Sequence, residues 1–273
     1  MRQIYPKLTD EIKKITSPKT IGKDEGYPIN TFRELVEHTA KLAYKNKDYI
    51  LFYRGQSTDH KNKNNYSSFY PSIYRSKYLK EEELTQRFKM LKYASKLLVE
   101  ELKNNNIEGY NEIARKKYVQ WSILQHYEVI ETPLIDVTQS LRVACSFATH
   151  NNKNNDKSAY VYVFGLPYYS NRITINSEHD LINIRLLSIS PPQALRPYFQ
   201  EGYLIGTTDI MNEFKSTELD LNQRLFAKFK IKNIDDFWDK EFTAIPKSAI
   251  YPDNDDIEKI CNKIKEKLKS NEK

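Results

Sequence analysis

Three short segments of the chain place charged or polar residues directly beside apolar runs. The first is residues 51–56, LFYRGQ, in which Arg54 follows an apolar stretch and precedes a glycine. Burying a guanidinium costs free energy unless an anionic group pairs with it. Arg54 therefore has two interpretations: an internal salt bridge to one of the chain's own carboxylates, or a two-pronged contact with a phosphate or carboxylate ligand.

The second segment, residues 124–148, contains a histidine and an aspartate ten positions apart. His126, at the end of a predicted helix, is either a structural histidine or one half of an acid–base pair with Asp136. Asp136 lies in a short apolar run, so we expect its carboxylate to be half-buried and hydrogen-bonded. Together with Thr138 it would also suit the N-cap of a helix.

The third segment, residues 193–203, contains Arg196, Gln200 and Glu201 at a predicted turn-to-strand transition. Polar residues in such a loop are either solvated or part of a site. Adjacent residues on a strand point to opposite faces, so only one of Gln200 and Glu201 can face a cleft if the segment is extended.

Composition excludes several classes of protein. The chain has 273 residues, of which 39% are hydrophobic and 29% charged, as in a globular domain. It contains no apolar run near the ~20 residues of a membrane span and no secretory signal, so we expect a cytoplasmic protein without membrane contacts. Cys145 and Cys261 are too few for a disulfide framework or a four-thiolate zinc site, and no metal is expected.

The net charge of +7 permits a polyanionic partner without requiring one, because basic residues must cluster to bind a phosphate backbone. The sequence also lacks the common nucleotide-binding, esterase and zinc-protease motifs. Neither observation by itself assigns a function.

Periodicity predicts one α+β domain with a small mixed or antiparallel sheet flanked by helices. We expect an N-terminal arm over residues 1–29 that packs weakly, a domain over 30–270, and a frayed tail over 271–273. Asn30 or Thr31 is the expected cap of the first long helix, and residues 218–231 fit either a helix or a strand. Helices are predicted over 30–47, 80–103, 111–127, 138–150, 234–242 and 253–270, and strands over 49–55, 158–166, 173–175, 186–189 and 203–205.

Taken together and in this order, the segments resemble the FRG domain, a family named for a Phe/Tyr-Arg-Gly motif. The resemblance covers roughly residues 30–270, with Glu128 and Pro133 departing from the family's usual residues and the connection over 129–132 looking one residue longer. Its motifs are Tyr53-Arg54-Gly55-Gln56, Pro71-Ser72-x-x-Arg75, Gln125-His126-Tyr127, Thr132-x-Leu134-x-Asp136-x-Thr138, Val143-Ala144-x-x-Phe147-Ala148, Arg196-x-x-x-Gln200-x-Gly202-Tyr203 and Tyr251-Pro252-Asp253.

FRG domains occur in bacterial and phage proteins near toxin or defence modules and look similar to ADP-ribosyltransferases. The resemblance implies an ADP-ribosyltransferase-like fold and an effector that uses NAD as co-substrate. In that chemistry a carboxylate stabilises the ribosyl cation, and Glu201 is the favoured late carboxylate. The implied catalytic residues are Arg54, His126, Asp136 and Glu201, and the implied NAD-binding residues are Arg54, Gln56, Tyr127, Ser146, Phe147 and Gln200.

The same residues leave two other functions open. One is a non-catalytic module that senses a nucleotide or a nucleic acid, using the basic surplus and the tyrosines for stacking. The other is a nucleotide-directed hydrolase or nuclease that uses His126 and Asp136. A transferase would also need an acceptor macromolecule, a protein or a nucleic acid. In each case we expect one cleft lined by Arg54, Gln56, His126, Tyr127, Asp136 and Ser146.

Overall fold

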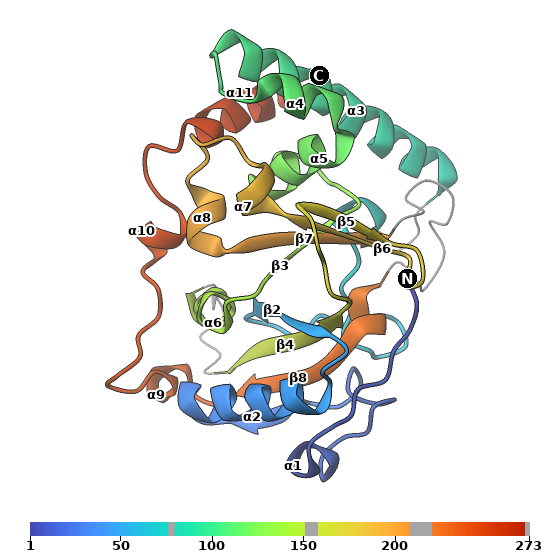
Figure 1. Cartoon of the computed structure of the whole chain (residues 1–273), viewed down its shortest axis with the longest axis vertical. Helices are drawn as coiled ribbons and strands as arrows, with labels where there is room; N and C mark the ends of the chain where they lie inside the picture. Colours follow the sequence, from blue (N-terminus) through green and yellow to red (C-terminus); the bar gives the residue numbers. More distant parts are fainter. Residues whose placement is uncertain (76–79, 151–157, 208–219, 271–273) are drawn as a thin grey trace.

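A computed structural model of the chain describes residues 1–75, 80–150, 158–207 and 220–270. These residues form a single domain around an eight-stranded mixed sheet with the order β1-β8-β4-β2-β3-β7-β6-β5 (Figure 1). The predicted fold class, a mixed sheet flanked by helices in one domain, is confirmed. The strands are β1 (Tyr27–Ile29), β2 (Ile50–Gln56), β3 (Ile135–Thr138), β4 (Ala159–Leu166), β5 (Ile173–Asn176), β6 (Leu181–Arg185), β7 (Gly202–Thr207) and β8 (Leu225–Ile231).

The helices follow the predicted amphipathic patterns where those patterns are long. Thr31 is the cap of α2, since its hydroxyl accepts a hydrogen bond from the amide of Glu34. The described helices are α1 (Asp10–Lys13), α2 (Phe32–Lys45), α3 (Glu81–Asn104), α4 (Tyr110–Arg115), α5 (Lys117–His126), α6 (Leu141–His150), α7 (Leu186–Ile189), α8 (Arg196–Gln200), α9 (Ile234–Phe237), α10 (Lys247–Ile250) and α11 (Asp256–Ser270), with 3-10 turns η1 (Ser72–Tyr74) and η3 (Leu221–Arg224).

Several short elements differ from the prediction. Residues 186–189, predicted as a strand, form helix α7, because a short apolar run does not distinguish a strand from a buried helical turn. The helix predicted over 111–127 is divided into α4 and α5 at Lys116, whose backbone is extended. Of the ambiguous segment 218–231, residues 225–231 form strand β8.

Two hydrophobic cores lie on opposite faces of β7. Tyr203 and Ile205 belong to the core that is covered by α2 and α6, whereas Leu204 belongs to the core formed with α3, α5 and α11. This alternation follows from the two-residue period of a strand. Each core also contains one free, buried cysteine, Cys145 in the first and Cys261 in the second.

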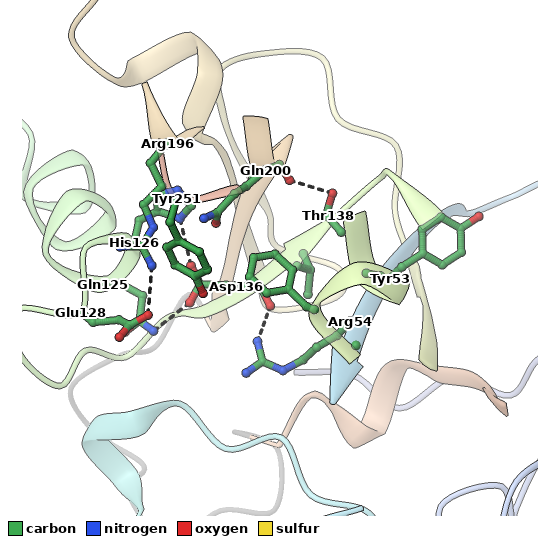
Figure 2. Close-up of a pocket in the computed structure, with 15 residues that line it drawn as sticks. Tyr53, Arg54, Gln125, His126, Glu128, Asp136, Thr138, Arg196, Gln200 and Tyr251 are labelled. Atoms are coloured by element: carbon green, nitrogen blue, oxygen red, sulfur yellow. Dashed lines mark hydrogen bonds and ion pairs between the residues drawn. The ribbon is translucent and has the colours of Figure 1, made fainter. Parts of the chain in front are cut away.

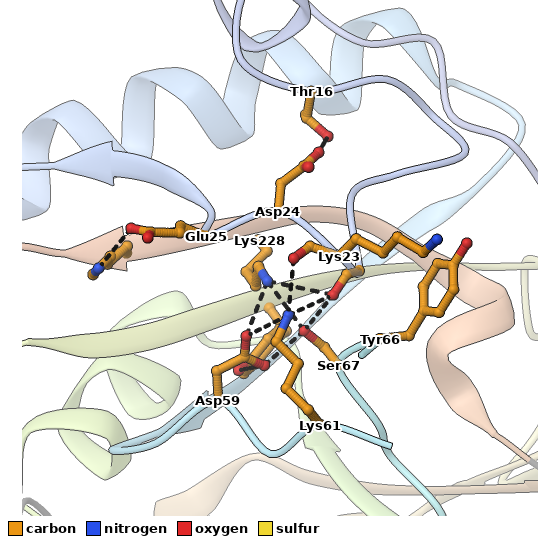
Figure 3. Close-up of polar contacts among 12 residues, drawn as sticks. Thr16, Lys23, Asp24, Glu25, Asp59, Lys61, Tyr66, Ser67 and Lys228 are labelled. Atoms are coloured by element: carbon orange, nitrogen blue, oxygen red, sulfur yellow. Dashed lines mark hydrogen bonds and ion pairs between the residues drawn. The ribbon is translucent and has the colours of Figure 1, made fainter. Parts of the chain in front are cut away.

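The N-terminal arm is packed into the first core, unlike the weak packing expected from its polar sequence. Its apolar side chains are buried: Met1, Ile4, Leu8, Ile12 and Ile21. The end of the arm is fixed by polar contacts, shown in Figure 3. The carbonyl oxygen of Gly22 accepts hydrogen bonds from Lys61 Nζ at 2.8 Å and from Ser67 Oγ at 3.0 Å.

A buried ion pair lies beneath this anchor (Figure 3). Lys228 Nζ lies 3.0 Å from Asp59 Oδ2, and the Lys228 side chain is fully buried. The other oxygen of Asp59 accepts hydrogen bonds from Ser67 and Tyr162. Burial lowers the pKa of Lys228 to about 8, although Asp59 opposes the shift. The arm, the loop after β2 and strand β8 are thus joined at one charged cluster.

Residues 271–273, the predicted frayed tail, lie outside the described residues. No helix in the described parts of the chain is long and apolar enough to cross a membrane.

Candidate functional site

The sheet is split between β2 and β3. β2 pairs with β4 along its whole length, and β3 pairs with β7 along its whole length. β2 and β3 share a single pair of partner residues, Tyr53 and Thr138. Because the two strands do not continue a ladder beyond this pair, their facing groups can border an open space.

A cavity of about 220 Å³ lies at this split and is partly open to solvent (Figure 2). Its volume is below the ~300–1,000 Å³ of pockets that enclose a drug-sized ligand. It therefore fits one part of a larger ligand. The lining residues come from β2, α5 and the segment after it, β3, α6, α8, β7 and the segment after α10: Tyr53, Arg54, Gly55, Gln125, His126, Glu128, Asp136, Val137, Thr138, Ala144, Phe147, Arg196, Gln200, Gly202 and Tyr251.

Arg54 bridges the split. Its Nη1 donates a hydrogen bond to the backbone carbonyl oxygen of Asp136 (Figure 2). Burial lowers the pKa of Arg54, and the nearby charge of Asp136 opposes that shift. The guanidinium thus faces the cavity with a neutral carbonyl as its hydrogen-bond acceptor among the described residues, which leaves other N–H groups for a ligand.

Gly55, the residue after this arginine, is required by packing. A Cβ atom built on Gly55 would lie 1.8 Å from the carbonyl oxygen of Ala144 and 2.9 Å from the amide nitrogen of Ala148, both in α6. Helix α6 can therefore approach β2 only where the strand has no side chain. The Arg-Gly pair combines a cavity-facing cation with the close helix contact that closes one wall.

Asp136 is the carboxylate of the cavity. Its Oδ2 accepts a hydrogen bond from Gln125 Nε2 at 2.8 Å, and its Oδ1 lies 3.3 Å from His126 Nδ1. Burial by itself would raise the pKa of Asp136, but the contact with His126 and the charge of Arg54 outweigh it, so that the pKa lies below its ordinary value. Asp136 is therefore ionised at neutral pH. It lies in strand β3 and is not a helix cap.

His126 is held by its surroundings. Its side chain is 3% exposed, and its Nε2 is buried with no hydrogen-bond partner among the described residues. Since an ionised carboxylate only accepts, Nδ1 carries the proton in the contact with Asp136. A Cβ atom on Gly202 would come within 3.2 Å of His126 Cε1, so the glycine leaves room for the imidazole ring.

Arg196 forms the opposite wall. Its side chain is 8% exposed, and its guanidinium carbon lies 4.6 Å from the centre of the Tyr251 ring and 5.6 Å from that of Tyr127. Arg196 Nη2 donates a hydrogen bond of 3.0 Å to Glu128, and Nη1 lies 3.9 Å from Glu258. Two aromatic faces thus cover the guanidinium, and its edge remains for polar contacts.

The end of helix α8 determines which of Gln200 and Glu201 lines the cavity. Gln200 ends α8 and lines the cavity, and its Nε2 donates to the carbonyl oxygen of Ile250. Glu201 has a left-handed backbone (φ 44°), is exposed and does not line the cavity. The segment is not extended there, so the strand alternation used in the prediction does not apply. The favoured late carboxylate therefore lies away from the cavity.

The structure brings together five of the predicted site residues: Arg54, His126, Asp136, Phe147 and Gln200. Phe147 supplies an aromatic wall and meets Tyr251 edge-to-face at 6.1 Å. Their chemical roles stay predictions.

Three further predicted residues do not line the cavity. Tyr127 is buried and its hydroxyl donates to Asp255, so its ring contacts Arg196 in place of a ligand. Ser146 Oγ donates to the carbonyl oxygen of Arg142 and accepts from the amide of Ile245, so it does not orient Arg54. Gln56, at the end of β2, has a buried Oε1 without a hydrogen-bond partner among the described residues. Contrary to the prediction, these three residues, like Glu201, do not line the cavity.

Six polar or aromatic wall residues were not among the predicted site residues: Tyr53, Gln125, Glu128, Thr138, Arg196 and Tyr251. All of them except Glu128 stand in the family motifs. Arg196 carried the strongest available signal, a cation in a mostly apolar turn beside a proline. Among the described residues, no group of three or more histidine, cysteine, aspartate or glutamate side chains is arranged to hold a metal ion.

The fold and the site define a mixed α/β domain with a polar, doubly cationic cavity at a split in its sheet. A model of the FRG domain family matches residues 48–157 of the chain, so the predicted resemblance is confirmed over these residues. The match includes Arg54, His126 and Asp136, whereas Arg196 and Gln200 lie beyond it. No curated protein and no solved structure matches the chain.

Proposed function

We propose that the cavity binds NAD or a related nucleotide and that the chain is an ADP-ribosyltransferase-like enzyme. The observation that carries the proposal is the ionised carboxylate of Asp136, held by His126 and Gln125 on the wall that it shares with Arg54. A fixed negative charge at such a place suits a reaction in which positive charge develops on the substrate. Asp136 takes the role that the sequence assigned to Glu201.

The dimensions support binding of part of a dinucleotide. A cavity of about 220 Å³ accommodates a nicotinamide riboside moiety, with Phe147 and Tyr251 as aromatic walls, and leaves the diphosphate near the opening. Arg54 and Arg196 are the cations that border this space. Guanidinium groups bind phosphate through paired N–H donors.

The proposed reaction breaks the bond between the anomeric carbon of the ribose and the nicotinamide nitrogen. The electron pair leaves with nicotinamide, which becomes neutral, and the positive charge develops on the ribose. Asp136 stabilises that charge; each ~1.4 kcal/mol of stabilisation is a tenfold change in rate. The acceptor, water or a macromolecule, then donates a lone pair to the anomeric carbon, and its proton passes to the His126–Asp136 pair.

The test is release of nicotinamide from NAD by the purified chain, compared with Asp136→Asn and Glu201→Gln. Both variants remove one carboxylate charge, but only Asp136 lines the cavity. We expect Asp136→Asn to lose about 100-fold or more of the rate, as when a preorganised group is removed, and Glu201→Gln to keep it. Equal losses in both variants, or a loss in Glu201→Gln alone, would contradict the proposal.

A second function, a non-catalytic nucleotide- or nucleic-acid-sensing module, is favoured by one observation. Of the two adjacent residues Gln200 and Glu201, the amide Gln200 lines the cavity and Glu201 faces solvent. An amide is a poor partner for a ribosyl cation. Saturable NAD binding without nicotinamide release would select this function. A cytoplasmic location and a role as a toxin or anti-phage defence effector stay predictions.

A further inference from the structure

Glu128, which pairs with Arg196, has an unusual backbone conformation. Glu128 follows the C-cap of α5 in a left-handed conformation, with φ at 54°. The amide of Glu128 donates to the carbonyl oxygen of Gln125, and that of Val129 donates to Leu124, which together form a Schellman motif. Glycine is the residue that adopts this position without steric cost. A glutamate accepts a steric cost at this position, which indicates that its side chain has a role.

The side chain of Glu128 contacts the edge of the Arg196 guanidinium. Arg196 is 8% exposed and its Nε is buried without a hydrogen-bond partner among the described residues. Its one described side-chain hydrogen bond, from Nη2 to Glu128, goes to a carboxylate that is itself 71% exposed. A buried cation is therefore hydrogen-bonded through Nη2 to a solvent-exposed carboxylate, while its Nη1 lies 3.9 Å from Glu258.

The position of Arg196 is fixed independently of Glu128. The carboxylate of Asp255, 2% exposed, accepts hydrogen bonds from the backbone amides of Leu195 and Arg196 and from the hydroxyl of Tyr127. Tyr127 and Tyr251 cover the guanidinium. Removing the Glu128 carboxylate therefore leaves the arginine in place and frees Nη2, with Glu258, 3.9 Å from Nη1, as the remaining described carboxylate neighbour.

We propose that Arg196 is a phosphate subsite of the cavity and that the Glu128 carboxylate closes it in the ligand-free protein. A phosphate group of the ligand would replace Glu128 and engage the guanidinium edge with two oxygens, a geometry that a planar fork of donors favours. Glu128 then acts as a competing anion that weakens binding of phosphate-bearing ligands. This inference deepens the proposed function by naming the group that the second arginine recognises, yet it concerns phosphate and does not require NAD.

The experiment measures the affinity for inorganic pyrophosphate by titration calorimetry at constant ionic strength. Glu128→Gln retains the length of the side chain and removes the competing charge. Glu131→Gln is the matched control, because Glu131 carries the same charge, pairs with Arg87 at 3.2 Å and does not line the cavity. We expect Glu128→Gln to bind pyrophosphate about fivefold tighter or more, a typical coupling between two ligands of one site, and Glu131→Gln to bind as the wild type does.

An Arg196→Lys substitution in the Glu128→Gln background should abolish the gain, since a lysine cannot present the paired donors. An equal gain in both glutamate variants would show a general charge effect and overturn the subsite, as would a gain that survives Arg196→Lys or an absence of pyrophosphate binding by Glu128→Gln. ADP-ribose, titrated in parallel, separates the two proposals. Tighter pyrophosphate binding by Glu128→Gln without ADP-ribose binding would retain the phosphate subsite and reject the nucleotide function.

Discussion

The guanidinium of Arg54 hydrogen-bonds the backbone carbonyl oxygen of Asp136, while the carboxylate of the same aspartate is held by His126 and Gln125. The two opposite charges thus border one cavity without pairing directly through a described hydrogen bond. Neither of the sequence interpretations of Arg54, an internal salt bridge or a ligand contact alone, describes this arrangement completely. The arginine both bridges the split in the sheet and keeps donors for a ligand.

Replacing Arg54 by alanine should abolish ligand binding at modest cost in stability. The substitution leaves the Asp136 carbonyl without its donor, which costs about 1–3 kcal/mol, but it strands no salt-bridged carboxylate. Arg54→Lys should also fail to bind, because a lysine has no two-pronged donor. Urea unfolding and NAD titration of both variants check this. A variant that binds normally but unfolds with a loss of about 3–5 kcal/mol would instead indicate a structural ion pair.

Replacing Gly55 by alanine should destabilise the domain by about 1–3 kcal/mol or more, the usual effect of overpacking. The new methyl group would overlap the carbonyl oxygen of Ala144, and backbone cannot move aside as a side chain can. Gly109→Ala is the control, since its Cβ would meet nothing within 4 Å and only its left-handed backbone, φ 78°, opposes the change. Thermal unfolding compares them; a Gly55→Ala loss no larger than that of Gly109→Ala would refute the packing argument.

The sequence predicted those parts of the fold and site that depend on local pattern. The apolar stripe of α11 and the Thr31 cap of α2 are readable without tertiary structure, and the structure contains both. Arg54 and Asp136 stood out because a charge inside an apolar run must meet a partner or a cavity. The expectation that both line one cavity is met by the geometry.

The remaining site residues depend on tertiary placement. The hydroxyl of Ser146 donates a hydrogen bond to the carbonyl oxygen four residues earlier, as serines in helices commonly do. Its presence in a motif therefore carried no information about Arg54. Tyr127 follows His126 at a helix end and points into the core, whereas Tyr251 arrives from a distant segment to line the cavity. No spacing rule relates Glu128, Arg196 and Tyr251 before the chain is folded.

Replacing Asp255 by alanine should weaken both stability and phosphate binding. Its Oδ1 accepts hydrogen bonds from the amides of Ile257 and Glu258 at the start of α11. Its Oδ2 accepts hydrogen bonds from the Tyr127 hydroxyl and the Arg196 amide and so positions both residues. Loss of a cap costs about 0.5–2 kcal/mol, and each buried donor left unsatisfied adds about 1–3 kcal/mol. Chemical unfolding with pyrophosphate titration below the unfolding range checks both effects. Unchanged pyrophosphate affinity in a destabilised variant would show that Asp255 does not position Arg196.

The buried Lys228 makes a contribution to stability that grows as the solution becomes alkaline. Its pKa is about 8 in the folded chain, whereas an unfolded lysine has a pKa of about 10.4. Between these values Lys228 binds more protons in the unfolded chain than in the folded one, so its contribution to the free energy of unfolding rises with pH, by about 2 kcal/mol from pH ~7.5 to ~9.5. Below that window the lysine is charged in both states and the slope disappears.

Urea unfolding across this pH range, with the wild type and Lys228→Met side by side, measures the effect. The methionine cannot titrate, so the slope of its free energy of unfolding against pH should be lower than that of the wild type by the amount that Lys228 contributes. Lys230→Met, two residues along β8 where the side chain is 29% exposed, is the matched control and should retain the wild-type slope. Burial also raises the pKa of Cys145 and Cys261, so these thiols lower the slope within the tested range, equally in all three proteins. Tyr162, whose pKa is raised mainly by burial, acts in the same direction as the thiols only above about pH 10, where unfolded tyrosine ionises. A slope in Lys228→Met equal to that of the wild type would mean that Lys228 stays charged beside Asp59 throughout the range.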